Sequence, residues 1–142
     1  MGKDNLENSV MAGILGVQSQ NRRFGEIIGE QNKDLTQILL FLLLQLKLSE
    51  GMKITEISDF FGMTAGGATA MSDKLEEQGL VTRERSKEDR RIVKVVLTDK
   101  GHERVRNIFS RFEEKDLSIL DEALKKSSEA MGKFINHMNQ KM

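Results

Sequence analysis

Two short helical patterns joined by a glycine-containing turn lie in the middle of this chain, and they restrict its fold more than any other feature. The first has Thr55 as its expected N-cap and continues through Phe61, where Gly62 is suited to end it in the left-handed conformation. The apolar residues expected to form its buried face are Ile57, Phe60 and Phe61. Thr64 can cap a second helix that runs to about Gln78. Two short helices joined in this way predict a helix-turn-helix.

After Gly79 the pattern changes from helical to extended. Val81–Arg85 and residues 92–97 are rich in Val, Ile and Thr, and they flank the polar loop of residues 86–91. This arrangement is typical of a β-hairpin with a charged tip. A further short extended piece is expected at residues 53–54. Beside a helix-turn-helix, such a hairpin forms a wing.

Helical patterns flank this region on both sides. An apolar stripe predicts a helix over about residues 5–30, and a second helix, apolar on most sides, runs from Asp34 as N-cap to Leu48. Thr98 is expected to cap a long helix whose apolar stripe continues to Leu124. A break is expected at residues 125–128, followed by a final helix. The predicted fold is mainly α with a small β-hairpin, a winged helix-turn-helix with helical extensions at both ends.

The length of the chain fits a single domain, residues 1–142. Within it we expect a winged-helix lobe at about residues 35–105 and helices suited to dimerisation at about residues 5–30 and 103–142. The apolar stripes of these terminal helices favour a homodimer, because such stripes need a partner surface.

Several classes of function are excluded by composition and motif content. The chain has no cysteine, so disulfides, thiolate metal sites and cysteine-based redox sensing are impossible. The most apolar segment, residues 35–48, is too short for a membrane span and no secretory signal is found, so we expect a cytoplasmic location without membrane contact. No nucleophile–base pair, phosphate loop or metal-ligand spacing is found, so we expect no enzyme activity, no cofactor and no metal.

Charge is distributed unevenly, although the formal net charge is zero. Residues 83–94 carry six basic and three acidic side chains, a net charge of +3, whereas residues 113–122 carry five acidic and one basic, a net charge of −4. One interpretation is an ordinary solvated surface; the other is a molecule with one end suited to phosphate. In a winged helix, the second paired helix reads base edges in the major groove and the hairpin tip meets phosphates or the minor groove.

The candidate DNA-binding residues lie in the second paired helix and in the hairpin. Arg90 and Arg91 occupy the expected tip, and Arg83 and Arg85 line the first strand. The full candidate set is Thr64, Ala65, Gly66, Gly67, Thr69, Ala70, Lys74, Arg83, Arg85, Lys87, Asp89, Arg90 and Arg91.

Three motifs within residues 54–105 resemble the multiple-antibiotic-resistance regulator (MarR) family. Residues 55–58, TEIS, are similar to the start of the helix before the family's recognition helix, and residues 73–81, DKLEEQGLV, to the end of the recognition helix and the entry to the wing. The most specific motif is Asp89, Arg90 and Arg91 followed, after a β run, by LTDKG at residues 97–101.

The resemblance implies a bacterial transcription regulator, a repressor, that binds a palindromic operator in double-stranded DNA as a homodimer. It also implies that Arg91 enters the minor groove at the wing tip, and that Asp89 orients it or a neighbouring arginine through a charge-assisted pair. Many members of the family release DNA when a small molecule binds between the dimerisation and DNA-binding regions. A small-molecule effector is therefore a candidate partner.

The second paired helix departs from the family pattern. Gly66, Gly67, Ala68, Thr69 and Ala70 stand where Ser, Thr and a basic residue are common in the family. One interpretation is that the glycines let the backbone approach DNA phosphates closely. Another is weakened or altered base readout, with Thr69 and Lys74 as the main polar candidates. The alternative function is a winged-helix module that binds another protein and has reduced base readout.

Overall fold

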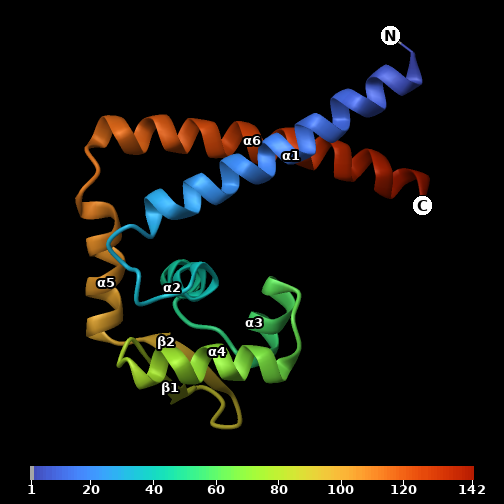
Figure 1. The fold of residues 1–142 in the computed structure, drawn as a ribbon. Coiled ribbons are helices and arrows are strands. Elements are labelled where there is room, and N and C mark those ends of the chain that lie inside the picture. Colours follow the sequence, from blue (N-terminus) through green and yellow to red (C-terminus); the bar gives the residue numbers. More distant parts are fainter. Residues whose placement is uncertain (1) are drawn as a thin grey trace. The chain divides into compact units, whose positions relative to one another are not determined.

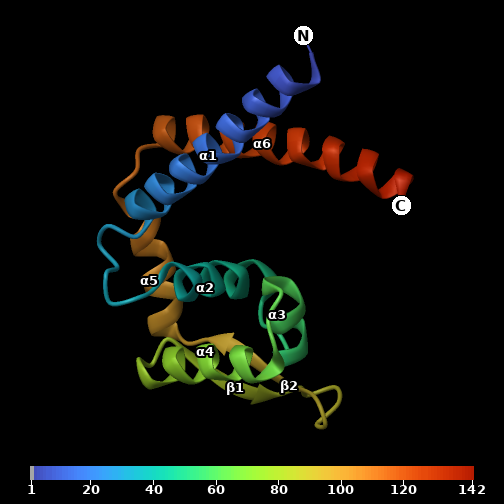
Figure 2. The ribbon, with the colours of Figure 1, turned by 45° about the vertical axis from the view of Figure 1, so that its right-hand side comes forward.

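A computed structural model describes residues 2–142 of the chain (Figures 1 and 2). The chain divides into two compact units: the first ends at Ile108, and the second is Phe109–Met142. Its helices and strands follow in the order α1 (Lys3–Ile28), α2 (Gln37–Ser49), α3 (Ile54–Phe61), α4 (Ala65–Glu77), β1 (Val81–Arg85), β2 (Val93–Leu97), α5 (Asp99–Ser110) and α6 (Glu114–Lys141). This order confirms the predicted winged helix-turn-helix. Within the described residues, no helix is long and apolar enough to cross a membrane.

The core of the first unit is built around α2. Five of its leucines are at most 5% exposed: Leu39, Leu40, Leu42, Leu43 and Leu46. Ile57 of α3, Leu75 of α4, Val95 of β2 and Ile108 of α5 are also buried. α2 contacts β2, α3 contacts α4, and α4 contacts β1. Because α2 is apolar on most sides, it supplies the shared core on which the paired helices and the hairpin rest.

Two helix starts differ from the predicted ones. α2 begins after Thr36, whose hydroxyl accepts a hydrogen bond from the Leu39 backbone N–H at 3.4 Å. The predicted cap, Asp34, instead accepts from the Arg104 guanidinium at 3.1 Å, a pairing between distant parts of the chain. α3 begins after Lys53, so Thr55 lies inside the helix, and the Glu56 carboxylate accepts from the Lys53 backbone N–H at 2.9 Å.

The buried face of α3 is narrower than predicted. Ile57 is fully buried and Phe61 is half-buried, but Phe60 is 58% exposed. Ser58 is buried instead, and its hydroxyl donates to the Thr55 carbonyl. Ile57, Ser58 and Phe61 share one side of the helix at 3.6 residues per turn, and Phe60 lies beyond the edge of that side.

The wing is a two-stranded antiparallel sheet in which Val81 pairs with Leu97 and Arg85 with Val93. The second strand was predicted from residue 92, but Ile92 precedes it. The extended piece predicted at residues 53–54 is also displaced. Met52 makes the bridge, because its backbone N–H and carbonyl bond to Val95 at 3.0 and 2.7 Å.

The predicted break at residues 125–128 is wrong, because α6 runs through it as one helix. Two ion pairs stabilise the helix there, Lys125 with Asp121 and Lys126 with Glu122, each at 2.8 Å. In each pair the two partners are one helical turn apart. The chain leaves the helical conformation earlier, at residues 111–113. The carboxylate of Asp116 accepts from the Glu113 backbone N–H at 2.9 Å, which starts a new helix.

Candidate nucleic-acid interface

α4 is the second helix of the helix-turn-helix, and local interactions fix its start. Gly62 ends α3 with φ +63°, a left-handed conformation that favours glycine. Two residues later, the Thr64 hydroxyl accepts from the Gly67 backbone N–H at 3.1 Å. The inward side of α4 is buried through Ala68, Met71, Ser72 and Leu75. The helix is therefore held by its cap and its inner face, and its outer face is free for recognition.

The outer face of α4 near its N-terminus carries only short side chains. Ala65, Gly66, Thr69 and Ala70 are exposed there, and Lys74 is exposed a turn further along. A Cβ atom at Gly66 would have only the Thr64 hydroxyl near it, at 3.9 Å, and at Gly67 nothing closer than 3.4 Å. Packing within the chain therefore does not require glycine at either position.

Arg83 of β1 connects the wing to α4. Its guanidinium donates to Asp73 and to Glu76, each at 2.7 Å, and its side chain is 29% exposed. Arg83 is predicted from the sequence as a DNA-binding residue, but in the structure two carboxylates surround its charge. Its geometry therefore suits positioning the wing against α4 better than meeting phosphate.

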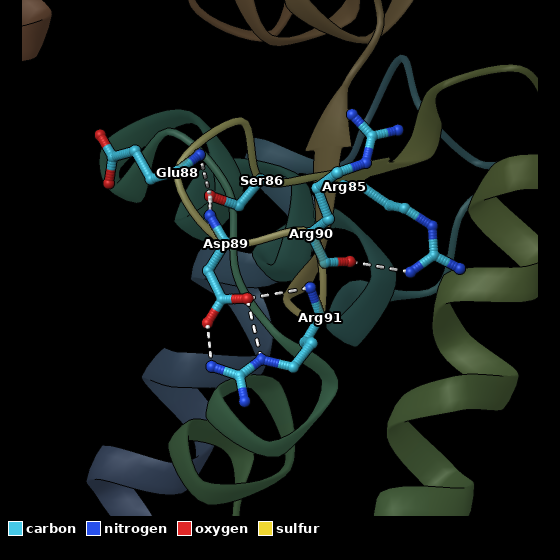
Figure 3. A network of polar contacts seen from close by, with 6 residues as sticks. All are labelled: Arg85, Ser86, Glu88, Asp89, Arg90 and Arg91. Carbon is cyan, nitrogen blue, oxygen red and sulfur yellow. Dashed lines mark hydrogen bonds and ion pairs between the residues drawn. The ribbon is translucent and has the colours of Figure 1, made fainter.

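Several local hydrogen bonds hold the wing tip (Figure 3). The Ser86 hydroxyl oxygen accepts from the backbone N–H groups of Glu88 and Asp89, at 3.2 and 3.3 Å. The Arg85 guanidinium donates to the Arg90 carbonyl at 2.9 Å. Arg85 thus closes the base of the tip. Ser86 is not among the residues predicted from the sequence, although a serine at the start of a loop is a recognised turn residue.

Asp89 and Arg91 form the central pair of the tip (Figure 3). The two oxygens of Asp89 accept from Nε and Nη2 of Arg91 at 3.1 and 3.0 Å, and Oδ1 also accepts from the Arg91 backbone N–H at 3.1 Å. These hydrogen bonds lower the pKa of Asp89 below its ordinary 3.8 and raise that of Arg91. The Arg91 side chain is 90% exposed, so its guanidinium is held in one orientation while facing solvent.

The remaining cations of the tip are exposed. No described residue forms an ion pair with Lys87 or with the Arg90 side chain, and both residues are exposed. Figures 1 and 2 both show the tip on the side where the N-terminal end of α4 lies. The structure thus brings together an exposed helix face and a cationic wing tip.

Among the described residues, no group of three or more His, Cys, Asp or Glu side chains is suited to hold a metal ion. His102 lies outside the surface, and its Nδ1 is 3.2 Å from the Lys47 ammonium.

The winged-helix part of the chain is similar to a known protein family. Residues 35–93, which span α2, the paired helices and the start of β2, match the MarR family. The chain is thus similar to the MarR family over its winged-helix part. The resemblance inferred from the motifs in residues 54–105 is therefore confirmed.

Two MarR-type relatives from Bacillus subtilis match this chain. One is the HTH-type transcriptional repressor MdtR, 32% identical over 71 residues, which are 50% of this chain and 46% of MdtR. The other is the uncharacterized HTH-type transcriptional regulator YpoP, 34% identical over 96 residues, 65% of each chain. The matched part spans about half to two thirds of these relatives. Both are named as transcription regulators.

Solved MarR-type structures share the fold over nearly the whole chain. A MarR-like transcriptional regulator from Thermotoga maritima has a TM-score of 0.56 at 26% identity and covers 93% of this chain and 98% of its own. A mutant MarR from E. coli, solved in complex with operator DNA, has a TM-score of 0.56 at 19% identity, covering 84% of this chain and 96% of its own. The second likeness supports the fold alone.

Proposed function

We propose that this chain, like the MarR family that it resembles, is a transcription regulator that binds double-stranded DNA. The observation that carries the proposal is the wing tip, where Asp89 holds a 90% exposed Arg91 guanidinium in place on the side where α4 begins. A fixed, exposed guanidinium suits the minor groove, whose negative potential favours arginine. The exposed face of α4 would lie in the adjacent major groove.

Each residue of the surface has a role in this proposal. Arg90, Arg91 and Lys87 meet the DNA at the wing, and Lys74 meets a phosphate beside α4. Asp89 and Arg85 position the tip, and Arg83 positions the wing against the helix. Thr64 holds the helix start, so its hydroxyl is already engaged. The remaining candidates, which lie in the first two turns of α4, contact the DNA directly: Ala65, Gly66, Gly67, Thr69 and Ala70.

We propose further that the chain acts as a homodimer on a palindromic operator. α1 buries only Ile28, and α6 buries no residue within the described chain. Large apolar side chains are exposed along both helices, among them Leu6, Val10, Ile14 and Leu15 of α1 and Ile119, Met131, Phe134 and Ile135 of α6. Extended apolar surfaces of this kind mark protein interfaces. A second copy supplies matching surfaces and brings a second reading helix, as a palindrome requires.

Repression and relief by a small molecule complete the proposal. The matching relative MdtR is named as a repressor. A cavity of about 580 Å³ lies between α1 and α2, lined by residues that include Arg22, Gly25, Lys33, Gln37 and Leu40. Its volume is within the range of small-molecule sites. Occupation of this cavity by an effector would change how α1 rests on the reading lobe.

The DNA-binding proposal is tested by salt dependence. We expect the full-length chain to bind a duplex selected from a random library, with an affinity that falls on the order of ten-thousandfold between 50 and 200 mM salt. The reason is that about four cations per subunit, eight per dimer, would release counterions from phosphate. Fluorescence anisotropy of a labelled duplex measures it. Failure to enrich any duplex at low salt, with one protein recovered in stoichiometric amount from a pull-down, would favour the protein-interaction alternative instead.

The dimer is tested on α6. Phe134 is 62% exposed and Asn136 is exposed two residues along, so either position accepts a glutamate without disturbing the chain's own packing. Phe134→Glu would place a charge in an apolar interface, and we expect it to raise the dimer dissociation constant at least about thirtyfold. Asn136→Glu, which adds the same charge to the same helix, is expected to change it little. Sedimentation of the unmodified chain as a monomer at micromolar concentration would contradict the proposal.

A further inference from the structure

Base readout by α4 depends on an outer face with no long polar side chain near the helix start. Ala65 and Thr69 are one helical turn apart, as are Gly66 and Ala70, so these four exposed residues share one face. Arginine or lysine would be needed to read guanine with paired hydrogen bonds, and asparagine or glutamine to read adenine. None of these residue types occurs in residues 64–73. What the face offers is methyl groups and a single hydroxyl.

We infer that α4 reads thymine through its C5-methyl group, with Thr69 and Ala70 as the specificity-determining residues. This inference rests on the proposed function, since it concerns which bases the DNA-binding surface prefers. In the major groove the C5-methyl of thymine is the one apolar group that a base edge presents, and alanine and the threonine methyl are side chains that contact it. The preferred half-site would therefore contain thymines under the first two turns of α4.

Methyl contacts have short range, so the helix has to approach the bases closely. Side chains of only one to three heavy atoms, such as those of alanine and threonine, reach a base edge only when the helix backbone lies deep in the groove. Gly66 and Gly67 allow that approach, because they remove the side chains that would hold the backbone away. The chain itself would accommodate a Cβ atom at both positions. The space that the glycines leave open can therefore be occupied by DNA.

The nearby polar groups are engaged or displaced from this face. The Thr64 hydroxyl accepts from the Gly67 backbone N–H and caps the helix. Asp73 accepts from Arg83 at 2.7 Å, which ties it to the wing. Lys74 lies in the last turn of α4, away from the helix start that meets the bases. Thymine methyl groups are thus the base feature that best matches what remains.

The test removes methyl groups one at a time from the DNA. A duplex selected with the full-length protein is resynthesised with deoxyuridine in place of each thymine, which deletes the C5-methyl and keeps the base pairing. We expect each deoxyuridine replacement under α4 to lower the affinity of the protein for the duplex about fourfold, or about fifteenfold when the same thymine is replaced in both half-sites. Thymines elsewhere in the duplex are the internal controls and are expected to change affinity less than twofold.

Two variants of Thr69 connect the effect to the protein. Thr69→Val keeps a methyl group and loses the hydroxyl, so its deoxyuridine penalty is expected to persist. Thr69→Ser keeps the hydroxyl and loses the methyl, so the penalty at one thymine is expected to disappear. Both variants leave the exposed helix position otherwise unchanged.

The outcomes separate this inference from the function on which it rests. If a duplex is bound and selected but deoxyuridine costs less than twofold everywhere, the thymine reading is wrong and the DNA-binding function stands. The same holds if 7-deazaguanine, which lacks the N7 acceptor, causes the main loss, because guanine would then be the base read. Absence of binding to every duplex overturns the proposed function, and this inference with it.

Discussion

Replacing Gly101 with alanine is expected to lower the free energy of unfolding by about 3 kcal/mol, through overpacking at a backbone that cannot move aside. Gly101 lies in the first turn of α5, and a Cβ atom there would overlap the Leu80 carbonyl oxygen, with Leu97 Cδ2 at 3.2 Å. That carbonyl accepts from the Thr98 backbone N–H at 3.1 Å, and the Leu80 backbone N–H donates to Leu75 at 3.0 Å. Leu80 is itself fully buried.

This contact explains the glycine of the LTDKG motif. The Thr98 hydroxyl donates to the Gly79 carbonyl at 2.6 Å and accepts from the Gly101 backbone N–H at 3.1 Å. α5 therefore starts directly on the segment that links α4 to β1. The absence of a side chain at Gly101 is what permits this approach, which sets the wing beside the reading helix.

Gly66→Ala is the matched control for this prediction. It also adds one methyl in the first turn of a helix of the same unit, but the nearest atom is the Thr64 hydroxyl oxygen at 3.9 Å. We expect unfolding free energy unchanged or raised by up to about 1 kcal/mol, because alanine favours the helix. Urea denaturation followed by circular dichroism, at one fixed protein concentration, measures both variants. Equal stability of Gly101→Ala and the unmodified chain would contradict the packing described for α5.

Features whose physical cause is local could be predicted from the sequence. The Thr64 cap, the left-handed Gly62 and the two strands of the wing depend on residues only a few positions apart. Caps and turns are determined by residues that are close in the sequence, so the local sequence is sufficient to predict them. The winged-helix order followed from these signals together.

Features that depend on distant residues could not be predicted. Arg83 reads as a free cation in the sequence, and only folding brings Asp73 and Glu76 to its guanidinium. Asp34 has the residue type of an N-cap but lies next to Arg104, 70 positions along. The turn at residues 111–113 was missed because it contains neither glycine nor proline, the usual signals of a helix end.

The sequence predicts which residues form the candidate site, whereas the structure is needed to propose a separate role for each of them. Arg83, Arg85 and Arg91 are the same residue type within nine positions, yet their guanidinium groups contact two carboxylates, a backbone carbonyl and Asp89 respectively. The Arg83 side chain is 29% exposed, whereas the Arg91 side chain is 90% exposed. Exposure and partner chemistry therefore assign the roles, and neither is visible in the charge pattern.

Arg91→Ala is expected to weaken DNA binding about tenfold per wing, and so about a hundredfold for a dimer with two wings, without changing stability. The affinity falls because a guanidinium that Asp89 already orients binds without losing much side-chain freedom. Stability is unchanged because the side chain is exposed. The pair persists at any pH near neutrality, since the Asp89 pKa is lowered below 3.8 and the pair is lost only as the pH falls through that lowered pKa.

Arg83→Ala provides the opposite pattern and separates contact from positioning. Its loss removes both ion pairs between β1 and α4, so we expect lower unfolding stability, and an affinity loss whose salt dependence matches that of the unmodified chain. Arg91→Ala, by contrast, is expected to make the slope of log affinity against log salt shallower by about two for the dimer. The reason is that each of the two wings loses one cation that neutralises a phosphate. If Arg83→Ala makes the slope shallower and Arg91→Ala does not, Arg83 is the residue that meets the DNA and the orientation imposed by Asp89 has no part in binding.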